Sequence, residues 1–165
     1  MSASVDRPPK RAVRRLRALR GCAGPEATAA RWSDIEKLAR CTLVARDGHR
    51  SLVTSGAWSG TQPGEHTIDI QFHAPITLRR LRVVCEETAV ARTQRLTIWA
   101  TLHRGERHRE LVRQTFTFTP DSAPRAIEDH EWTIEQVSGI QLRIVPDIDG
   151  RAVRARIVSL QLVAD

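Results

Sequence analysis

Hydrophobic and polar residues alternate through most of the chain after residue 41. Successive side chains of a strand point to opposite faces, so a period of two predicts strands with one buried and one solvated face. The clearest segments are residues 67–72, 80–85, 95–102, 113–118, 140–144 and 158–162. Shorter candidates are residues 42–45, 52–54 and 131–134. The pattern therefore predicts about nine strands.

One short helix is expected before these strands. Ser33 is followed three residues later by Glu36, which is the spacing of a capping box at a helix N-terminus. Ile35, Leu38 and Ala39 then form a short apolar stripe at helical spacing.

The order of these elements favours an antiparallel architecture. No second long helical period follows, so crossover helices between parallel strands are not available. We predict an all-β fold, an antiparallel two-sheet sandwich of jelly-roll type, with a tight turn at His73 to Ile76. A closed up-and-down barrel is the alternative, because the number of strands does not decide whether a sheet closes.

The positive charge of the chain is concentrated in an N-terminal arm. Residues 1–20 hold seven basic residues and one acid, a net +6 of the +7 carried by all 165 residues. We expect residues 1–28 to form a basic, largely disordered arm before a domain at residues 29–165. An arm that becomes ordered on nucleic acid or on an anionic membrane is the alternative. Its candidate contact residues are Arg11, Arg14, Arg15 and Arg17.

Length and composition exclude several classes of protein. The chain is too short for a large multidomain enzyme, and 41% hydrophobic residues are enough for one core. No apolar run is long enough to cross a membrane, and no signal peptide is recognisable. Its three cysteines lack the spacing of a metal finger or of a disulfide framework. We expect a soluble, unsecreted, cytoplasmic protein.

Candidate binding residues follow from how antiparallel strands distribute their loops. If each strand reverses the one before it, alternate loops lie at the same end of the sandwich. One end then collects an aromatic side chain, carboxylates, a glutamine and arginines, a composition that suits the hydroxyl groups and ring face of a sugar. The candidates are Trp58, Glu86, Glu87, Arg92, Gln94, Asp121, Arg125 and Asp147. The alternative is that these loops are polar only because water surrounds them.

Several of these segments resemble a known family. Trp58-Ser59-Gly60, the strand at residues 67–72 and Leu81-Arg82-Val83-Val84 are similar to the opening of a galactose-binding-like domain of the discoidin (coagulation factor type C) kind. Residues 140–146 and 157–163 resemble its closing strands, so the resemblance spans residues 30–165. Arg92-Thr93-Gln94 also resembles part of small bacterial proteins with this fold. The resemblance implies a jelly-roll sandwich that binds its ligand at the loops of one end.

The sequence does not indicate an enzyme. Gly56-Ala57-Trp58-Ser59-Gly60 has its serine one place late for a nucleophile elbow, and His103 and His108 lack the spacing of zinc ligands. Asp147-Ile148-Asp149-Gly150 does not continue as an EF-hand loop. A calcium ion held by Asp147 or Asp149 with Glu86 or Asp121 stays open, and no other cofactor is expected.

We therefore predict a non-catalytic binding module for a carbohydrate or a small polar ligand at the Trp58 end. The alternative is a protein or nucleic-acid interaction module that holds its partner with the arginine-rich arm. Arm-driven binding would weaken steeply with salt, whereas sugar binding would barely respond.

Overall fold

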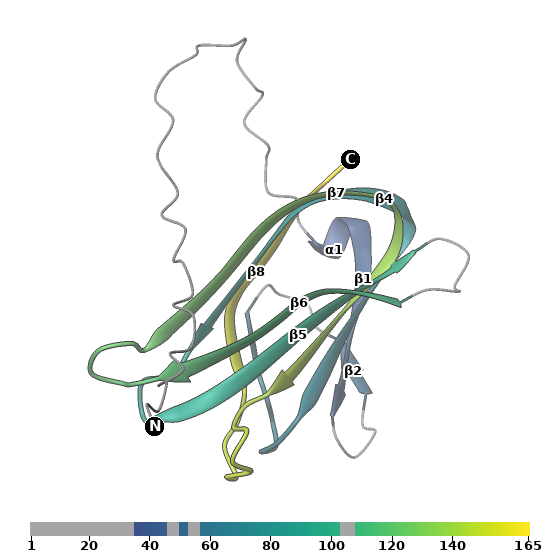
Figure 1. Cartoon of the computed structure of the whole chain (residues 1–165). Coiled ribbons are helices and arrows are strands. Elements are labelled where there is room, and N and C mark those ends of the chain that lie inside the picture. Colours follow the sequence, from purple (N-terminus) through teal and green to yellow (C-terminus); the bar gives the residue numbers. More distant parts are fainter. Residues whose placement is uncertain (1–34, 46–49, 53–56, 103–107) are drawn as a thin grey trace, which may run out of the picture.

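The computed structural model describes residues 35–45, 50–52, 57–102 and 108–165 (Figure 1). Its elements are α1 (Ile35–Leu38), β1 (Ala39–Ala45), β2 (Arg50–Leu52), β3 (Trp58–Ser59), β4 (His66–Glu86), β5 (Arg92–Leu102), β6 (His108–Phe118), β7 (Arg125–Val145) and β8 (Arg156–Ala164). The helix α1 is a single turn within the segment where the sequence predicts one, and its expected cap, Ser33, lies outside the described residues.

Every strand pairing among the described residues is antiparallel. The predicted all-β, antiparallel two-layer architecture is confirmed. The barrel alternative is not observed, because β6 pairs only with β5 among the described strands and the sheet does not close there.

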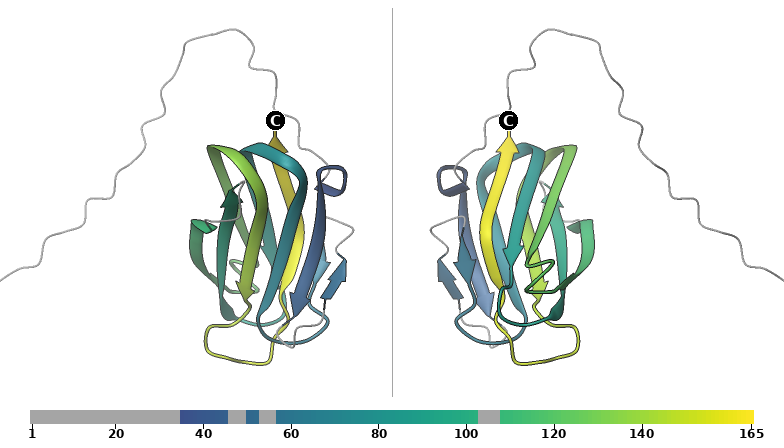
Figure 2. Two further views of the ribbon diagram at one scale, coloured as in Figure 1. Left: turned by 90° about the vertical axis from the view of Figure 1, so that its right-hand side faces the viewer. Right: turned by 90° about the vertical axis from the view of Figure 1, so that its left-hand side faces the viewer.

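Two long strands create both layers. β4 and β7 have 21 residues each and pair from His66 opposite Ile144 to Glu86 opposite Arg125. The first part of β4 lies beside β1 in the strand order β2-β1-β4-β7-β5-β6, whereas its second part pairs with β8. Figures 1 and 2 show both strands bending over one end of the molecule, so that one continuous sheet folds into two facing layers.

The prediction of a tight turn at His73 to Ile76 is wrong. β4 continues through these residues, and its register with β7 shifts between Gln71 and Arg80 as both strands bend. Pro75 is exposed at the bend, where the regular pairing of β4 with β7 is interrupted between Gln71 and Ile76. Proline has no N–H to donate, and it is tolerated here because no regular ladder hydrogen bond is lost. A turn and a bend that changes layers need similar residues, so the local sequence does not distinguish them. The chain still reverses its direction here.

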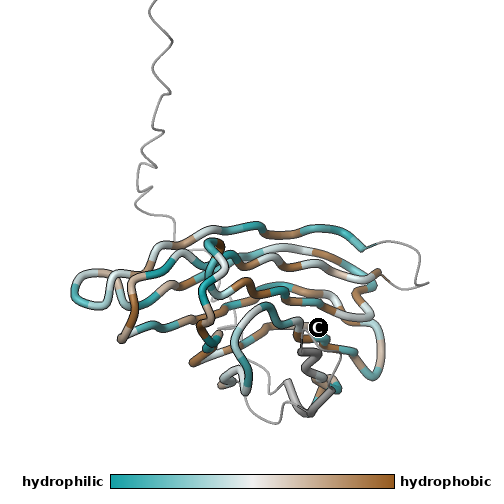
Figure 3. The backbone as a smooth tube through the Cα atoms, turned by 90° about the horizontal axis from the view of Figure 1, so that it is seen from below, coloured by the Kyte–Doolittle hydropathy of each residue, from teal (hydrophilic) through white to brown (hydrophobic). Residues whose placement is uncertain are grey.

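The core lies between the two layers. Figure 3 shows hydrophobic and hydrophilic positions alternating along the strands. The inner face of one layer supplies Ile68, Ile70, Leu96, Ile98, Ile140 and Leu142, and the other supplies Leu81, Val83, Leu160 and Leu162, all of them buried. This packing fixes both ends of the sandwich, where the loops and the bends lie.

Gly139 allows β7 to lie close against β4 near the bend. A Cβ atom at this position would lie 2.9 Å from the carbonyl oxygen of Ile70, closer than a real Cβ atom approaches backbone. We expect Gly139→Ala to lower the free energy of unfolding by about 1–2 kcal/mol, because the two paired strands must move apart. Urea denaturation measures this change, and an unchanged midpoint would show that the contact is not tight.

Candidate functional site

Four loops gather at the end of the sandwich opposite the bends, which we call the loop end. They are residues 57–65, 87–91, 119–124 and 146–155. Backbone hydrogen bonds join them, as from Gly60 N–H to the Ala155 carbonyl (2.9 Å) and from Glu87 N–H to the Pro124 carbonyl (2.8 Å). Figure 2 shows the 146–155 loop at this end and the C-terminus at the other. The predicted candidate residues, far apart in sequence, therefore do lie at one end.

Arg92 is the centre of a buried network at the loop end. Its side chain has no exposed surface, its Nε donates to Glu87 Oε2 (2.9 Å), and its Nη1 donates to Gln94 Oε1 (3.1 Å) and to the Pro146 carbonyl. The guanidinium carbon also lies 5.0 Å from the centre of the Phe118 ring. The polar groups of this network thus bond mainly to one another and to the neighbouring loop; its members are Arg92, Glu87 and Gln94.

Glu87 also organises its own loop. Its Oε1 accepts the backbone N–H groups of Ala89 (2.8 Å) and Val90 (3.2 Å). Burial alone would raise the pKa of Glu87, but these N–H groups and the Arg92 guanidinium outweigh it and hold the pKa below its ordinary value. The carboxylate is therefore charged and committed to the loop.

Asp147 is buried and closes the turn after β7. Its Oδ1 accepts the Asp149 N–H (3.1 Å), and its Oδ2 accepts from the Arg151 guanidinium. Burial raises the pKa of Asp147, but Arg151, the Asp149 N–H and the charge of Arg92 lower it more strongly, so that the net shift is downward. Among the residues that the structure describes, no three His, Cys, Asp or Glu side chains are grouped to hold a metal ion.

The other candidates of the loop end are more exposed. Arg125 Nη2 donates to Glu86 Oε2 (2.8 Å), and this contact lowers the pKa of Glu86. Asp121 is exposed, and the half-buried Trp58 packs its ring edge-on against His66 at 5.1 Å between centroids. Ligand contact by any of the eight candidates stays a prediction.

A cavity of about 320 Å³ lies at the loop end. Trp58 is not part of its lining, which consists of Gly64, Glu65, Val145, Pro146, Asp147, Ile148, Gly150 and Arg151. An aromatic platform and this cavity are therefore not combined in one site. The arm residues Arg11, Arg14, Arg15 and Arg17 lie outside the described residues.

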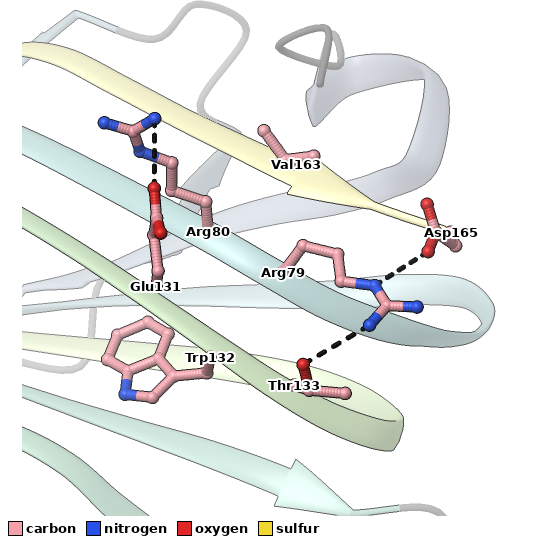
Figure 4. Close-up of a pocket in the computed structure, with 7 residues that line it drawn as sticks. All are labelled: Arg79, Arg80, Glu131, Trp132, Thr133, Val163 and Asp165. Carbon is pink, nitrogen blue, oxygen red and sulfur yellow. Dashed lines mark hydrogen bonds and ion pairs between the residues drawn. The ribbon is translucent and has the colours of Figure 1, made fainter. Parts of the chain in front are cut away.

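A second concave surface lies over β4, β7 and β8, towards the bends. We call it the Trp132 groove; it has a volume of about 660 Å³ and is lined by Arg79, Arg80, Glu131, Trp132, Thr133, Val163 and Asp165 (Figure 4). Leu78 pairs with both Ile134 and Ala164, so the three strands meet at this point. Sheet pairing alone thus brings these residues together.

Ion pairs fix the two arginines of the groove. Arg79 Nε donates to Asp165 Oδ2 (2.7 Å) and its Nη1 to Thr133 Oγ1 (3.3 Å). Arg80 makes two hydrogen bonds to Asp129 (2.7 and 2.8 Å) and lies 3.3 Å from Glu131, and the bond from Arg80 lowers the pKa of Asp129. The lining holds two arginines and two acids, so its formal charge is zero.

Trp132 stands at the rim of the groove, in the part of β7 that pairs with β4 alone among the described strands. Figure 4 shows Glu131 turned towards Arg80 and Trp132 on the other side of the β7 ribbon. Its half-buried ring stacks on His130 (5.4 Å between centroids, 14° between planes), and His130 Nε2 lies 3.0 Å from Glu128 Oε2. Trp132 alternates with Glu131 and Thr133, so its indole lies on the face of β7 that packs against the core. It lines the groove from the opposite side of the strand to the charged side chains.

Sequence reasoning did not identify the Trp132 groove. The residues alternate correctly in each strand, with Arg80 and Arg82 outside Leu81 and Val83, but their meeting depends on which strands pair. The one available signal was an oppositely charged pattern, basic in residues 79–82 and acidic in residues 128–131.

The buried cysteines lack the features of activated nucleophiles. Cys41 and Cys85 are both reduced, and burial raises the pKa of the Cys85 thiol to about 11. A thiol reacts as its thiolate, so Cys85 is protonated and unreactive at neutral pH.

No helix among the described residues is long and apolar enough to cross a membrane. No family model matches the chain, and no curated protein matches it in sequence.

Solved structures similar to the chain include a pectin-binding carbohydrate-binding module (TM-score 0.46, 11% identity, covering 64% of this chain and 70% of that one). Another is the N-terminal domain of the single-strand break repair protein XRCC1 (TM-score 0.47, 8% identity, 64% and 78%). A third is the C-terminal domain of a chitobiase from Bacteroides fragilis (TM-score 0.40, 15% identity, 66% and 72%). These likenesses concern the fold alone.

Proposed function

We propose that this chain is a non-catalytic binding module and that it binds a carbohydrate in the Trp132 groove. The observation that carries the proposal is an oriented tryptophan beside a groove of about 660 Å³ whose polar side chains are open to solvent. Ligand pockets usually have volumes of roughly 300–1,000 Å³ and combine apolar surface with a few placed polar groups.

The chemistry of the groove suits a neutral ligand with many hydroxyl groups. A sugar hydroxyl both donates and accepts, so it can accept from Arg79 or Arg80 and donate to Glu131 or Asp165. The apolar part of a sugar ring can contact the exposed part of the half-buried Trp132 indole, which lines the groove from the other side of β7. A strongly anionic ligand would need an excess of positive charge, and the balanced lining does not provide it.

The loop end supports the same function less well. Arg92, Gln94 and Asp147 are buried there, and most of their polar groups are bonded to other parts of the protein, whereas Arg92 Nη2 is buried without a partner among the described residues. A ligand that used them would have to break hydrogen bonds that hold the loops together, at a cost of about 1–3 kcal/mol for each group left unpaired.

A glycan array with wild type and two matched tryptophan variants tests the proposal. We expect Trp132→Ala to weaken binding of the selected glycan at least tenfold, which corresponds to about 1.4 kcal/mol, because the aromatic platform is lost. Trp58→Ala, at the loop end, should bind like wild type, and circular dichroism should show that both variants are folded. Loss of binding only in Trp58→Ala would move the site to the loop end. Absence of any bound glycan with wild type would contradict carbohydrate binding.

A further inference from the structure

The first half of β7 is an open strand edge. Residues 125–134 pair with β4 alone among the described strands, because the pairing of β5 with β7 covers only Val137 to Val145. Unpaired N–H and C=O groups along such an edge can pair with another strand, and folded proteins usually block this with proline, lysine or a bulge.

Residues 125–129 lack those protections. They contain no proline or lysine, and their register with β4 is regular from Arg80 to Glu86. The other long edge strand, β6, is different, because its register with β5 shifts beside Trp99. The β7 edge is therefore the regular one of the two, and a second strand could lie against it.

The exposed face of this edge is apolar at its centre and oppositely charged on its two sides. Arg125, Ile127 and Asp129 lie opposite Glu86, Val84 and Arg82 of β4, and alternate residues of a strand share a face. Ile127 is 51% exposed, the highest value among the exposed large hydrophobic residues of the described chain.

We propose that two copies of this chain dimerise by pairing residues 125–129 of β7 antiparallel about a two-fold axis at Ile127. Ile127 then lies opposite Ile127 of the partner subunit, and Arg125 lies opposite Asp129 of the partner subunit. The isoleucine pair lies on the axis and occurs once, and the Arg125–Asp129 pair occurs twice, as a two-fold interface requires. Opposite charges and apolar pairs directly across two strands each stabilise the pairing.

Charge selects this register over its neighbours. A two-fold axis at Ala126 or Glu128 would place Ile127 opposite a charged residue, Arg125 or Asp129 of the partner subunit. An axis at Arg125 or Asp129 would place like charges opposite each other, which destabilises pairing. Arg125 is already bonded to Glu86 through one nitrogen and Asp129 to Arg80, but the Arg125 side chain is 57% exposed and keeps two nitrogens for a second carboxylate. The charge pattern of residues 125–129 therefore favours a second copy of this chain as the strand that pairs with the β7 edge.

The dimer would leave the Trp132 groove open. Trp132 follows the paired segment on the same strand, so each subunit would present its own groove beyond the interface. Two linked grooves would strengthen attachment to a ligand with repeated units through effective concentration. The dimer itself does not depend on carbohydrate binding.

Sedimentation of the full chain over a range of concentrations tests the dimer. We expect wild type to dimerise with rising concentration, Ile127→Lys to stay monomeric, and Ile148→Lys to behave as wild type. Ile148 is a matched control because it is 42% exposed and lies at the loop end. A monomeric wild type at all concentrations, or a dimer that survives Ile127→Lys, would overturn the proposal.

Cross-linking tests the register. Cys22, the remaining cysteine of the sequence, is first replaced by serine so that it cannot compete, and Cys41 and Cys85 are buried. In this Cys22→Ser background, Ile127→Cys should form an intersubunit disulfide at least tenfold faster than Ile148→Cys under mild oxidation. The reason is that opposite residues of an antiparallel pair have Cβ atoms about 4.5–5.5 Å apart, close to disulfide geometry. Equal rates for the two variants would contradict the two-fold axis at Ile127.

Discussion

Replacing Arg92 by methionine is expected to lower the free energy of unfolding by about 3–5 kcal/mol. Methionine fills much of the space of the arginine stem but donates no hydrogen bond. Glu87, Gln94 and the Pro146 carbonyl would then lose their shared donor within a buried site. Leaving one member of a buried charge pair without its partner is the costly event, because the remaining carboxylate has little access to water.

Urea denaturation of wild type, Arg92→Met and Arg92→Lys measures this effect. Lysine keeps the charge, but its single ammonium cannot reproduce the planar set of donors, so we expect Arg92→Lys to be destabilised as well. Arg125→Met is the matched control, because the exposed Arg125–Glu86 pair should contribute less than about 1 kcal/mol. If Arg92→Met were as stable as Arg125→Met, the buried network would not hold the loop end.

Asp147→Asn is expected to destabilise the protein by about 2 kcal/mol at pH 7 and by less at pH 3. Asparagine still accepts the Asp149 N–H, but it loses the charged acceptor of Arg151. The pKa of Asp147 is lowered in the folded protein. Its carboxylate therefore adds stability above the unfolded pKa of about 3.9, and this contribution disappears as the pH falls through the lower folded pKa.

The difference between wild type and Asp147→Asn should accordingly be constant from pH 7 to about pH 5 and then shrink. Urea denaturation at pH 7, 5, 4 and 3 follows it directly. The whole protein should also lose stability over this acid range, because the pKa values of Glu87 and Asp129 are lowered by their own partners. A difference that stayed the same at pH 3 would show that the charge of Asp147 is not what stabilises the turn.

Much of the fold could be predicted from the sequence because its causes are local. The period of two in residues 67–72 and 80–85 reports the buried and solvated faces of β4. The bend between these segments could not be distinguished from a turn, because Pro75 and its exposed neighbours suit both. What differs is the pairing with β7, which depends on residues more than fifty positions away.

The candidate site was predictable only in part. Alternating loops placed Arg92, Glu87 and Asp147 at one end of the sandwich, and the structure places them there. Alternation also puts Arg92 and Gln94 on the inner face with Leu96, a signal that they are buried. It does not show how completely such residues bond to one another. The Trp132 groove depends on three strands from distant parts of the chain, so strand order had to be known first.

The central claim is that ligand binding occurs beside Trp132 and not at the loop end. Titration of the full chain with its selected glycan, followed through the indole N–H signals in a nitrogen–proton NMR spectrum, tests this claim most directly. Substitution of each tryptophan assigns its signal. The account predicts that the signal of Trp132 shifts on titration while those of Trp58 and Trp99 stay in place. A shift of the Trp58 signal with an unmoved Trp132 signal would contradict it.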